Sequence, residues 1–245
     1  MVAIILAAGY RTRLYPLTEN TPKALLPVGD RTLLGHVEKK LADPEMGIRR
    51  VILVSNHRFA GKFKEWAAQP GHSVDWTVLD DGSTSDENRL GSMGDLAFAI
   101  KAEKVDDDLL VLGSDNLFED GLTGLVQFAR QKGASTLGAY ELPDRTLANQ
   151  YGVLSAGTDG RITKFEEKPA KPESSLISTA VYFFPRKAVG VVLEYVSSQK
   201  ATDKLGSFIS WLVSREPVYA YRFRGHWFDI GDIASYKHAQ ETFRS

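Results

Sequence analysis

Charged residues that could hold phosphate groups gather in the first loop of the chain. The apolar run 2–8 is followed by Gly9 and then by Arg11, Arg13 and Lys23. A loop at the carboxyl end of a buried parallel strand is a common phosphate site, since its backbone N–H groups can face an anion. Glycine would let a phosphate group approach the backbone closely, and the cationic side chains would balance the negative charge of that group. A surface loop with ordinary salt bridges fits the same residue types, so both interpretations stand at this point.

The loop matches neither common phosphate-binding pattern. It lacks the Gly-Lys-Ser/Thr of a P-loop, and Arg11 and Leu14 stand where the dinucleotide pattern Gly-x-Gly-x-x-Gly requires glycine. A Rossmann dehydrogenase also needs an acidic ribose ligand about twenty residues further on. Asp30 is a poor candidate because Pro27 precedes it in a loop. A nicotinamide-dependent dehydrogenase is therefore disfavoured.

Composition narrows the class of protein further. The 245 residues carry 30 Lys plus Arg against 31 Asp plus Glu, a net charge of -1. This balance argues against nucleic acid or an anionic membrane as partner, because both usually require a basic surplus. The chain has no cysteine, which excludes thiolate catalysis, disulfides and cysteine-based zinc sites. With no signal peptide and no apolar run of spanning length, we expect a soluble, cytoplasmic protein. No feature predicts an oligomeric state.

Short apolar runs alternate with helical patterns in the first part of the chain. Buried parallel strands are predicted at 2–8, 49–56, 108–116 and 134–142, with a further, alternating strand at 73–81. Helices are predicted at 32–42, 58–68, 94–103 and 122–133. This order is typical of an open, mostly parallel sheet with helices on both faces, whose ligands lie beyond the carboxyl ends of the strands.

The pattern changes after about residue 142 and becomes richer in strands. The second part predicts a hairpin over 151–169 that turns at 158–160, a strand at 176–185, a helix at 188–198, a strand and loop at 218–232, and a closing helix at 233–243. Without a repeat or a linker, the chain is expected to form one domain with a parallel-sheet part and a β-rich part.

Four segments resemble the sugar-1-phosphate nucleotidylyltransferases, the nucleotide-diphospho-sugar pyrophosphorylases that include the glucose-1-phosphate thymidylyltransferases. LAAGYRTRLYPLTENTPKALLPV, Leu6 to Val28, resembles their signature L-A-A-G-x-G-T-R-L-x-P-L-T, a spacer, and P-K-x-L-L-P-V. Three later segments resemble further motifs of the family, in the order in which the family has them. They are VLGSDN (111–116), YGVLSAGTDGRITKFEEKP (151–169) and GHWFDIGD (225–232). The resemblance covers residue 1 to about residue 238.

The resemblance implies an α/β fold, a Rossmann-like three-layer sandwich with a mostly parallel central sheet and a β-rich sugar-binding subregion. It implies a single nucleotidyltransferase domain, 1–245, with a nucleotide-binding half at about 1–142 and a sugar-binding half at about 143–245. The substrates would be a nucleoside triphosphate (NTP) and a sugar 1-phosphate, whose phosphate oxygen attacks the α-phosphorus in line and releases pyrophosphate. Such chemistry needs positioning and charge neutralisation rather than a nucleophilic side chain.

The family match assigns catalysis to four residues. Asp115 and Asp229 would bind Mg²⁺, which commonly takes one or two protein carboxylates and completes its shell with phosphates and water. By residue type alone, Asp115 could equally be a turn residue and Asp229 the partner of an arginine. Arg13 and Lys23 would grip the β- and γ-phosphates, although a lysine in a proline-rich loop could also be simply solvated.

The match assigns the remaining site residues by position. The nucleotide would be bound by Leu6, Ala7, Ala8, Gly9, Arg11, Thr12, Arg89, Gly94 and Asn116. The sugar would be bound by Tyr151, Gly152, Glu167, Lys168 and Thr179. Ser114 is extra before Asp115, Arg11 replaces the family's glycine and Ala180 replaces another. Arg11 could contact phosphate or point to solvent, and Ala180 reduces the room for the sugar. Without the resemblance, Glu167 and Lys168 would fit an exposed strand end.

The base and the acceptor remain open. Arg89 stands where thymidylyl enzymes have glutamine, while residues 91–94 resemble a guanylyl motif. Arginine cannot accept a hydrogen bond, so it suits cytosine O2/N3 or guanine O6/N7, or faces water. The alternatives are cytidylyl or guanylyl transfer to a non-sugar acceptor such as phosphocholine or an inositol phosphate, and a catalytically silent, nucleotide-binding regulatory subunit. A silent subunit should have lost a magnesium Asp or Lys23, and the chain has kept both.

Overall fold

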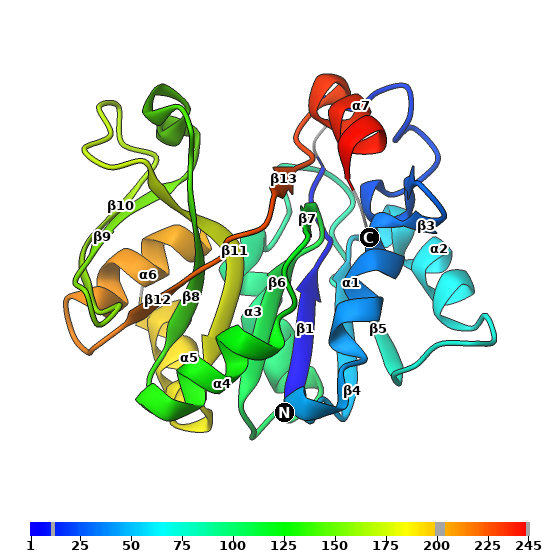
Figure 1. Ribbon diagram of the computed structural model, residues 1–245. Coiled ribbons are helices and arrows are strands. Elements are labelled where there is room, and N and C mark those ends of the chain that lie inside the picture. Colours follow the sequence, from blue (N-terminus) through cyan, green and yellow to red (C-terminus); the bar gives the residue numbers. More distant parts are fainter. Residues whose placement is uncertain (11–12, 199–203, 244–245) are drawn as a thin grey trace.

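A large sheet runs through the whole molecule (Figure 1). The computed structural model describes residues 1–10, 13–198 and 204–243. In these residues the sheet contains β1 (Val2–Leu6), β4 (Arg50–Ser55), β5 (Trp76–Asp80), β6 (Leu109–Gly113), β8 (Thr136–Glu141), β9 (Gly152–Ala156), β10 (Ile162–Glu167), β11 (Leu176–Phe184) and β12 (Tyr219–Arg222). Its order is β10-β9-β11-β6-β1-β4-β5, with β8 paired to β11 and β12 paired to β8.

The sheet is mostly parallel, as predicted. Strand β1 pairs in parallel with β4 and β6, and β4 pairs in parallel with β5. Strand β11 runs antiparallel to β6 and to β8, so β8 and its parallel neighbour β12 share the direction of β1. Leu6 lies opposite Val54 and Gly113. The carboxyl ends of the three central strands therefore lie level, and their loops leave from one edge.

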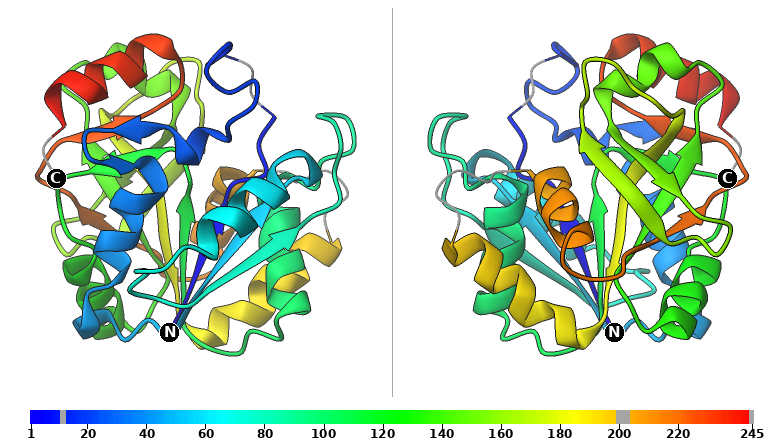
Figure 2. Two further views of the ribbon diagram at one scale, coloured as in Figure 1. Left: turned by 90° about the vertical axis from the view of Figure 1, so that its right-hand side faces the viewer. Right: turned by 90° about the vertical axis from the view of Figure 1, so that its left-hand side faces the viewer.

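Helices cover both faces of the sheet, which confirms the predicted three layers (Figure 2). The helices in the described residues are α1 (Leu33–Leu41), α2 (His57–Ala67), α3 (Gly91–Ala102), α4 (Thr123–Lys132), α5 (Val189–Ser198), α6 (Leu205–Val213) and α7 (Ile233–Thr242). Val2 and Ile4 pack in one core with α3, α5 and α6. Ala3 and Ile5 point the other way and pack with α1, α2 and α4, because successive side chains of a strand alternate between its faces.

Short elements complete the edge where the loops leave the sheet. They are the strand pairs β2 (Pro27–Val28) with β3 (Arg31–Thr32) and β7 (Asn116–Phe118) with β13 (Trp227–Asp229), and the 3₁₀ turns η1 (Lys23–Leu25), η2 (Pro44–Met46), η3 (Arg145–Gln150) and η4 (Arg186–Ala188). Asp232 caps the start of α7 by accepting a hydrogen bond from the Ser235 N–H at 2.8 Å. In the part of the chain that the structure describes, no helix has the length and apolarity to cross a membrane.

Each of the helices expected from the sequence is present within three residues of its predicted start and end. The hairpin also forms, as β9 and β10 around a turn in which Gly160 has a φ of 84°. Helix α6 was missed. Its sequence LGSFISWLV is apolar on most sides and begins after Lys204, which makes no side-chain cap, so neither the period nor a start signal marked it.

A buried and a half-buried carboxyl group, those of Asp95 and Asp81, join α3 to the end of β5. Asp95 is 5% exposed and faces Asp81, which accepts hydrogen bonds at 2.7 Å from the N–H and the hydroxyl of Ser83. Burial, the charge of Asp81 and a hydrogen bond with it raise the pKa of Asp95 to about 8. Asp95 Oδ1 and Asp81 Oδ2 find no other partner among the described residues. The Asp95 carboxyl group therefore keeps its proton at neutral pH.

Asp95→Asn should stabilise the protein, and increasingly so as pH rises from about 4 to about 8. In this range the folded state keeps a proton that the unfolded state has lost, so the stability of the native protein falls with rising pH. Asparagine donates its hydrogen bond at every pH. We expect a melting temperature higher by about 3 °C or more at pH 8.5, measured by thermal unfolding across pH.

The exposed Asp75→Asn variant is the control, with no pH-dependent gain expected. A gain for Asp95→Asn that is equal at both ends of the pH range would contradict the raised pKa of Asp95.

Candidate active site

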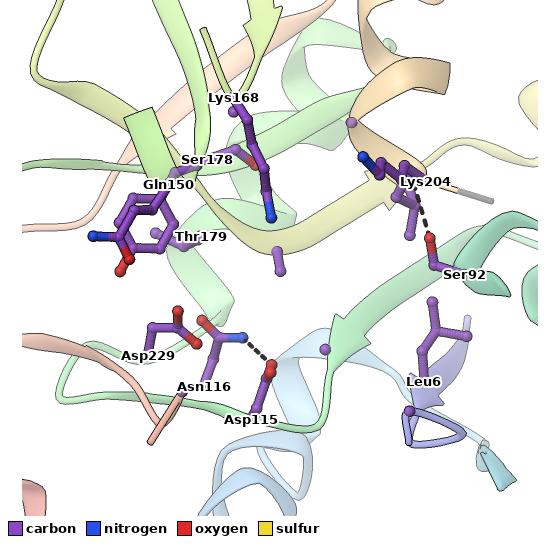
Figure 3. Close-up of a pocket in the computed structure, with 18 of the residues that line it drawn as sticks. Leu6, Ser92, Asp115, Asn116, Gln150, Lys168, Ser178, Thr179, Lys204 and Asp229 are labelled. Atoms are coloured by element: carbon purple, nitrogen blue, oxygen red, sulfur yellow. Dashed lines mark hydrogen bonds between the residues drawn. The ribbon is translucent and has the colours of Figure 1, made fainter. Parts of the chain in front are cut away.

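A cavity of about 650 Å³ opens at the carboxyl edge of the sheet. Its walls come from both parts of the chain, with Leu6 at the end of β1, Gly113 at the end of β6, Thr179 on β11 and Gly206 in the first turn of α6. Open α/β sheets bind their ligands at this edge. Figure 3 shows side chains from several elements converging on the cavity.

The cavity brings together most of the residues predicted from the sequence. Those that line it are Leu6, Ala8, Gly9, Arg13, Arg89, Asp115, Asn116, Tyr151, Gly152, Glu167, Lys168, Thr179 and Asp229. Ala7 and Lys23 line a neighbouring cavity of about 470 Å³, which also touches Asp115. Arg11 and Thr12 lie outside the described residues.

Gly94 differs from the other predicted residues because it lies inside α3. A Cβ atom there would be 2.8 Å from the Leu90 Cβ, so this glycine is required by packing within the helix. Gly9 has the opposite surroundings, since a Cβ atom would meet nothing within 4 Å. The space in front of Gly9 is open to a ligand.

Asp115, Asn116 and Asp229 form the floor of the cavity (Figure 3). The pairing of β7 with β13 sets Asn116 opposite Asp229, and the Ile230 N–H donates to the Asp115 carbonyl oxygen at 2.9 Å. Asn116 Nδ2 donates to Asp115 Oδ1 at 2.8 Å, while Asn116 Oδ1 accepts from Trp227 Nε1 at 2.8 Å. Both carboxylates are thereby fixed on one surface.

A cation already contacts this floor, since Lys23 Nζ donates to Asp115 Oδ2 at 3.0 Å. Across the described residues, no three His, Cys, Asp or Glu side chains gather into a metal site. Two carboxylates nevertheless fit Mg²⁺, which often binds protein through one or two carboxylates and otherwise through substrate phosphates and water. The donor set suits a metal that arrives with a phosphorylated substrate better than a permanently caged ion.

Tyr151 links the β-rich part of the chain to this floor. Its ring packs edge-on against Trp227, with ring centroids 5.2 Å apart. Burial raises the pKa of the Tyr151 phenol most, and the charge of Asp229 and a hydrogen bond with it raise that pKa further. The phenol therefore stays protonated and donates to Asp229, which orients that carboxylate.

Arg13 and Asp229 both approach Gly231. A Cβ atom added to Gly231 would be 4.0 Å from the Arg13 guanidinium and 3.8 Å from Asp229 Oδ2. The positive charge of Arg13 also contributes to the low pKa of Asp232, after the hydrogen bonds from Ser235 that lower it most. Arg13 therefore lies near the acidic floor of the cavity.

The opposite wall carries a half-buried carboxylate and two lysines. Burial raises the pKa of the Glu167 carboxyl, and the charges of Lys168 and Lys204 oppose that rise. Lys168 and Lys204 both line the cavity, and Figure 3 shows Lys168 reaching into it. Lys168 has a φ of 49°, and its N–H donates to the Tyr151 carbonyl oxygen at 3.0 Å. A left-handed conformation of a non-glycine residue is strained, so this hydrogen bond helps to hold the lysine in place.

Several lining residues were not identified from the sequence. They are Gln150, Ser178, Tyr182, Lys204, Gly206, Ser92 and Asp95. Lys204 and Gly206 belong to the start of the missed helix, so no predicted element led to them. Ala180, which also lines the cavity, lies at an irregularity of β11 and has a φ of 55°.

The chain is similar to known nucleotidyl transferases along nearly its whole length. The family model described as "Nucleotidyl transferase" matches residues 2–245. A putative mannose-1-phosphate guanyltransferase of Sulfolobus acidocaldarius is 32% identical over 231 residues, which are 94% of this chain and 59% of that protein. The bifunctional protein GlmU of Methanocaldococcus jannaschii is 28% identical over 231 residues, 94% of this chain and 51% of that protein. The chain thus spans about half to six-tenths of these relatives.

Solved structures share the fold along nearly the whole chain. A UDP-glucose pyrophosphorylase complexed with UDP-glucose has a TM-score of 0.84 at 18% identity and covers 98% of this chain, with 97% of its own chain matched. A putative glucose-1-phosphate thymidylyltransferase from Bacillus anthracis has a TM-score of 0.79 at 24% identity, with 100% and 98% covered. The family model extends over all four motifs and over both walls of the cavity. The chain belongs to the nucleotidyl transferase family.

Proposed function

We propose that the protein transfers a nucleotidyl group from an NTP to a sugar 1-phosphate in a Mg²⁺-dependent reaction that releases pyrophosphate. One observation carries the proposal: a single cavity joins the first loop, the floor of Asp115 and Asp229, and the wall of Glu167 and Lys168. In-line transfer requires the metal to lie between the triphosphate and the phosphorylated acceptor in one cavity. The names of the relatives, which include a UTP-glucose-1-phosphate uridylyltransferase of Synechocystis 29% identical over 246 residues, support the same reaction.

The residues of the chain divide the work by charge. Arg13 and Lys23 bind the triphosphate and stabilise the departing pyrophosphate, and Lys23 exchanges its contact with Asp115 for phosphate oxygens. Mg²⁺ bound to Asp115 and Asp229 would neutralise phosphate charge and polarise the α-phosphate. Lys168 orients the acceptor phosphate, and Glu167 accepts hydrogen bonds from acceptor hydroxyls. The first half of the chain then binds the nucleotide and the second half the acceptor.

The wall that carries Glu167, Lys168 and Lys204 is called the acceptor wall here. Its charges favour a sugar phosphate over phosphocholine. A quaternary ammonium group is normally bound by aromatic faces and by negative charge. Here Tyr151 and Trp227 supply aromatic surface, but Lys168 and Lys204 lie beside the single carboxylate of Glu167. Two ammonium groups repel a cationic acceptor. Neutral hydroxyl groups can bond to both the lysines and the carboxylate.

The test of this proposal is pyrophosphate release across a grid of NTPs and acceptors. Five NTPs are each combined with several sugar 1-phosphates, with phosphocholine and with an inositol phosphate, in magnesium and in chelator. We expect magnesium-dependent release with a sugar 1-phosphate, and the active NTP identifies the base.

Release with phosphocholine in place of the sugars would overturn the choice of acceptor. An NTP that binds without turnover in any combination would favour a regulatory subunit instead.

Asp229→Asn should lower kcat at least about a hundredfold, because charge stabilisation by a bound metal is worth several kcal/mol. Asp115→Asn should act similarly and should also release Lys23. Asn still accepts the Tyr151 hydrogen bond, so the fold should persist. Turnover at saturating magnesium and far-ultraviolet circular dichroism measure the two effects.

Asp232→Asn is the matched control, since Asp232 lines the same cavity and asparagine caps a helix as well as aspartate does. A loss for Asp232→Asn as large as that for Asp229→Asn would point to general charge rather than metal binding.

A further inference from the structure

A glycine occupies the first turn of α6, where helix formation gives no reason for it. Gly206 is buried and follows Leu205, the first residue of the helix. Glycine is the poorest helix former after proline, and a glycine inside a helix usually has a packing or functional reason. The φ of Gly206 is not in the left-handed region, so its backbone conformation does not require glycine. The reason must lie in the space beside it.

That space is filled by the Glu167 carboxylate. A Cβ atom on residue 206 would be 1.9 Å from Glu167 Oε2 and 2.5 Å from Glu167 Cδ. Such distances are far below van der Waals contact, so any side chain at 206 would displace the carboxylate. Gly206 and Glu167 both line the cavity. The Glu167 carboxylate therefore occupies the space that a side chain at position 206 would fill.

The helix itself is held in place, so it cannot move away to make room. The Leu205 N–H donates to Ser92 Oγ at 2.9 Å, and Ser210 Oγ donates to the Phe165 carbonyl oxygen at 3.3 Å. Leu205 is also buried. In contrast, Glu167 ends β10 and has a flexible side chain, to which no hydrogen-bond partner is assigned among the described residues. A bulkier residue at 206 would move Glu167 rather than α6.

The first turn of α6 also favours a negative charge at this position. The N-terminal end of a helix carries unpaired N–H groups and a partial positive charge. Lys204, the residue before the helix, provides no side-chain cap. The helix end therefore favours the ionised form of Glu167, as do the charges of Lys168 and Lys204, against the burial that raises the pKa of its carboxyl group.

We propose that Gly206 is a positioning residue for the acceptor. It allows Glu167 to lie against the start of α6, where the carboxylate can accept hydrogen bonds from a polyhydroxylated acceptor such as a sugar 1-phosphate. This inference rests on the proposed function and adds to it a residue that determines acceptor binding without touching the acceptor itself.

The test is a double-mutant cycle with Gly206→Ala and Glu167→Ala, using the NTP and the sugar 1-phosphate found active in the grid. Gly206→Ala should raise the KM of the sugar 1-phosphate at least about tenfold, the value of a hydrogen bond to a charged group. The KM of the NTP should stay unchanged. In the Glu167→Ala background, Gly206→Ala should have no further effect on either KM.

Gly61→Ala is the matched control, because Gly61 lies in α2 and a Cβ atom there would meet nothing within 4 Å. It should leave both KM values unchanged. Equal effects of Gly206→Ala in both backgrounds, or no effect on the acceptor KM, would overturn the role of Gly206.

If Gly206→Ala fails to fold, Glu167→Asp withdraws the carboxylate by one methylene group and leaves the helix intact. It should raise only the acceptor KM, and an unchanged value would overturn the inference. A wild-type protein that is silent across the whole grid would refute the proposed function together with this inference. An active wild-type protein with an unaltered Gly206→Ala variant would refute the inference alone.

Discussion

The pairing of β7 with β13 is the contact on which the cavity depends. Asp115 and Asp229 are 114 positions apart in the chain (229 minus 115), and the two short strands set them on one floor. Two carboxylates on one surface repel each other, and this repulsion must be offset by cations. Lys23 forms an ion pair with Asp115, while the Tyr151 hydroxyl donates a hydrogen bond to Asp229. The floor is thus built to accept positive charge.

Strand β11 makes the two walls of the cavity parts of one rigid unit. It pairs with β8 on one side and with β6 and β9 on the other. The wall that carries Glu167 belongs to the hairpin next to β11, and the pairing of Ile177 with Val153 joins that hairpin to the central sheet. Such a scaffold suits a reaction that depends on the positioning of two substrates more than on a reactive side chain.

Much of this architecture was predictable from the sequence because the signals are local. The apolar run VAIIL predicts β1, and the helical patterns predict the helices that cover it. The turn at 158–160, which ends in Gly160, predicts the hairpin. The cluster of Asp115 and Asp229 required the family resemblance, since nothing local relates residues so distant. Neither the local sequence patterns nor the family resemblance identified Lys204 and Gly206. The apolar helix that they begin has no period, and the closeness of Gly206 to Glu167 exists only in three dimensions.

The backbone departs from ordinary preferences mainly where it surrounds the cavity. Three non-glycine residues in the described chain have positive φ, and two of them, Lys168 and Ala180, line the cavity. The third, Lys104, follows the end of α3, where a left-handed residue is common. Gly206 adds a weak helix former to the same wall. Folding alone would favour other residues or conformations at these positions. Their concentration on the acceptor wall indicates that the shape of this wall, rather than the stability of the sheet, determines which residues occupy it.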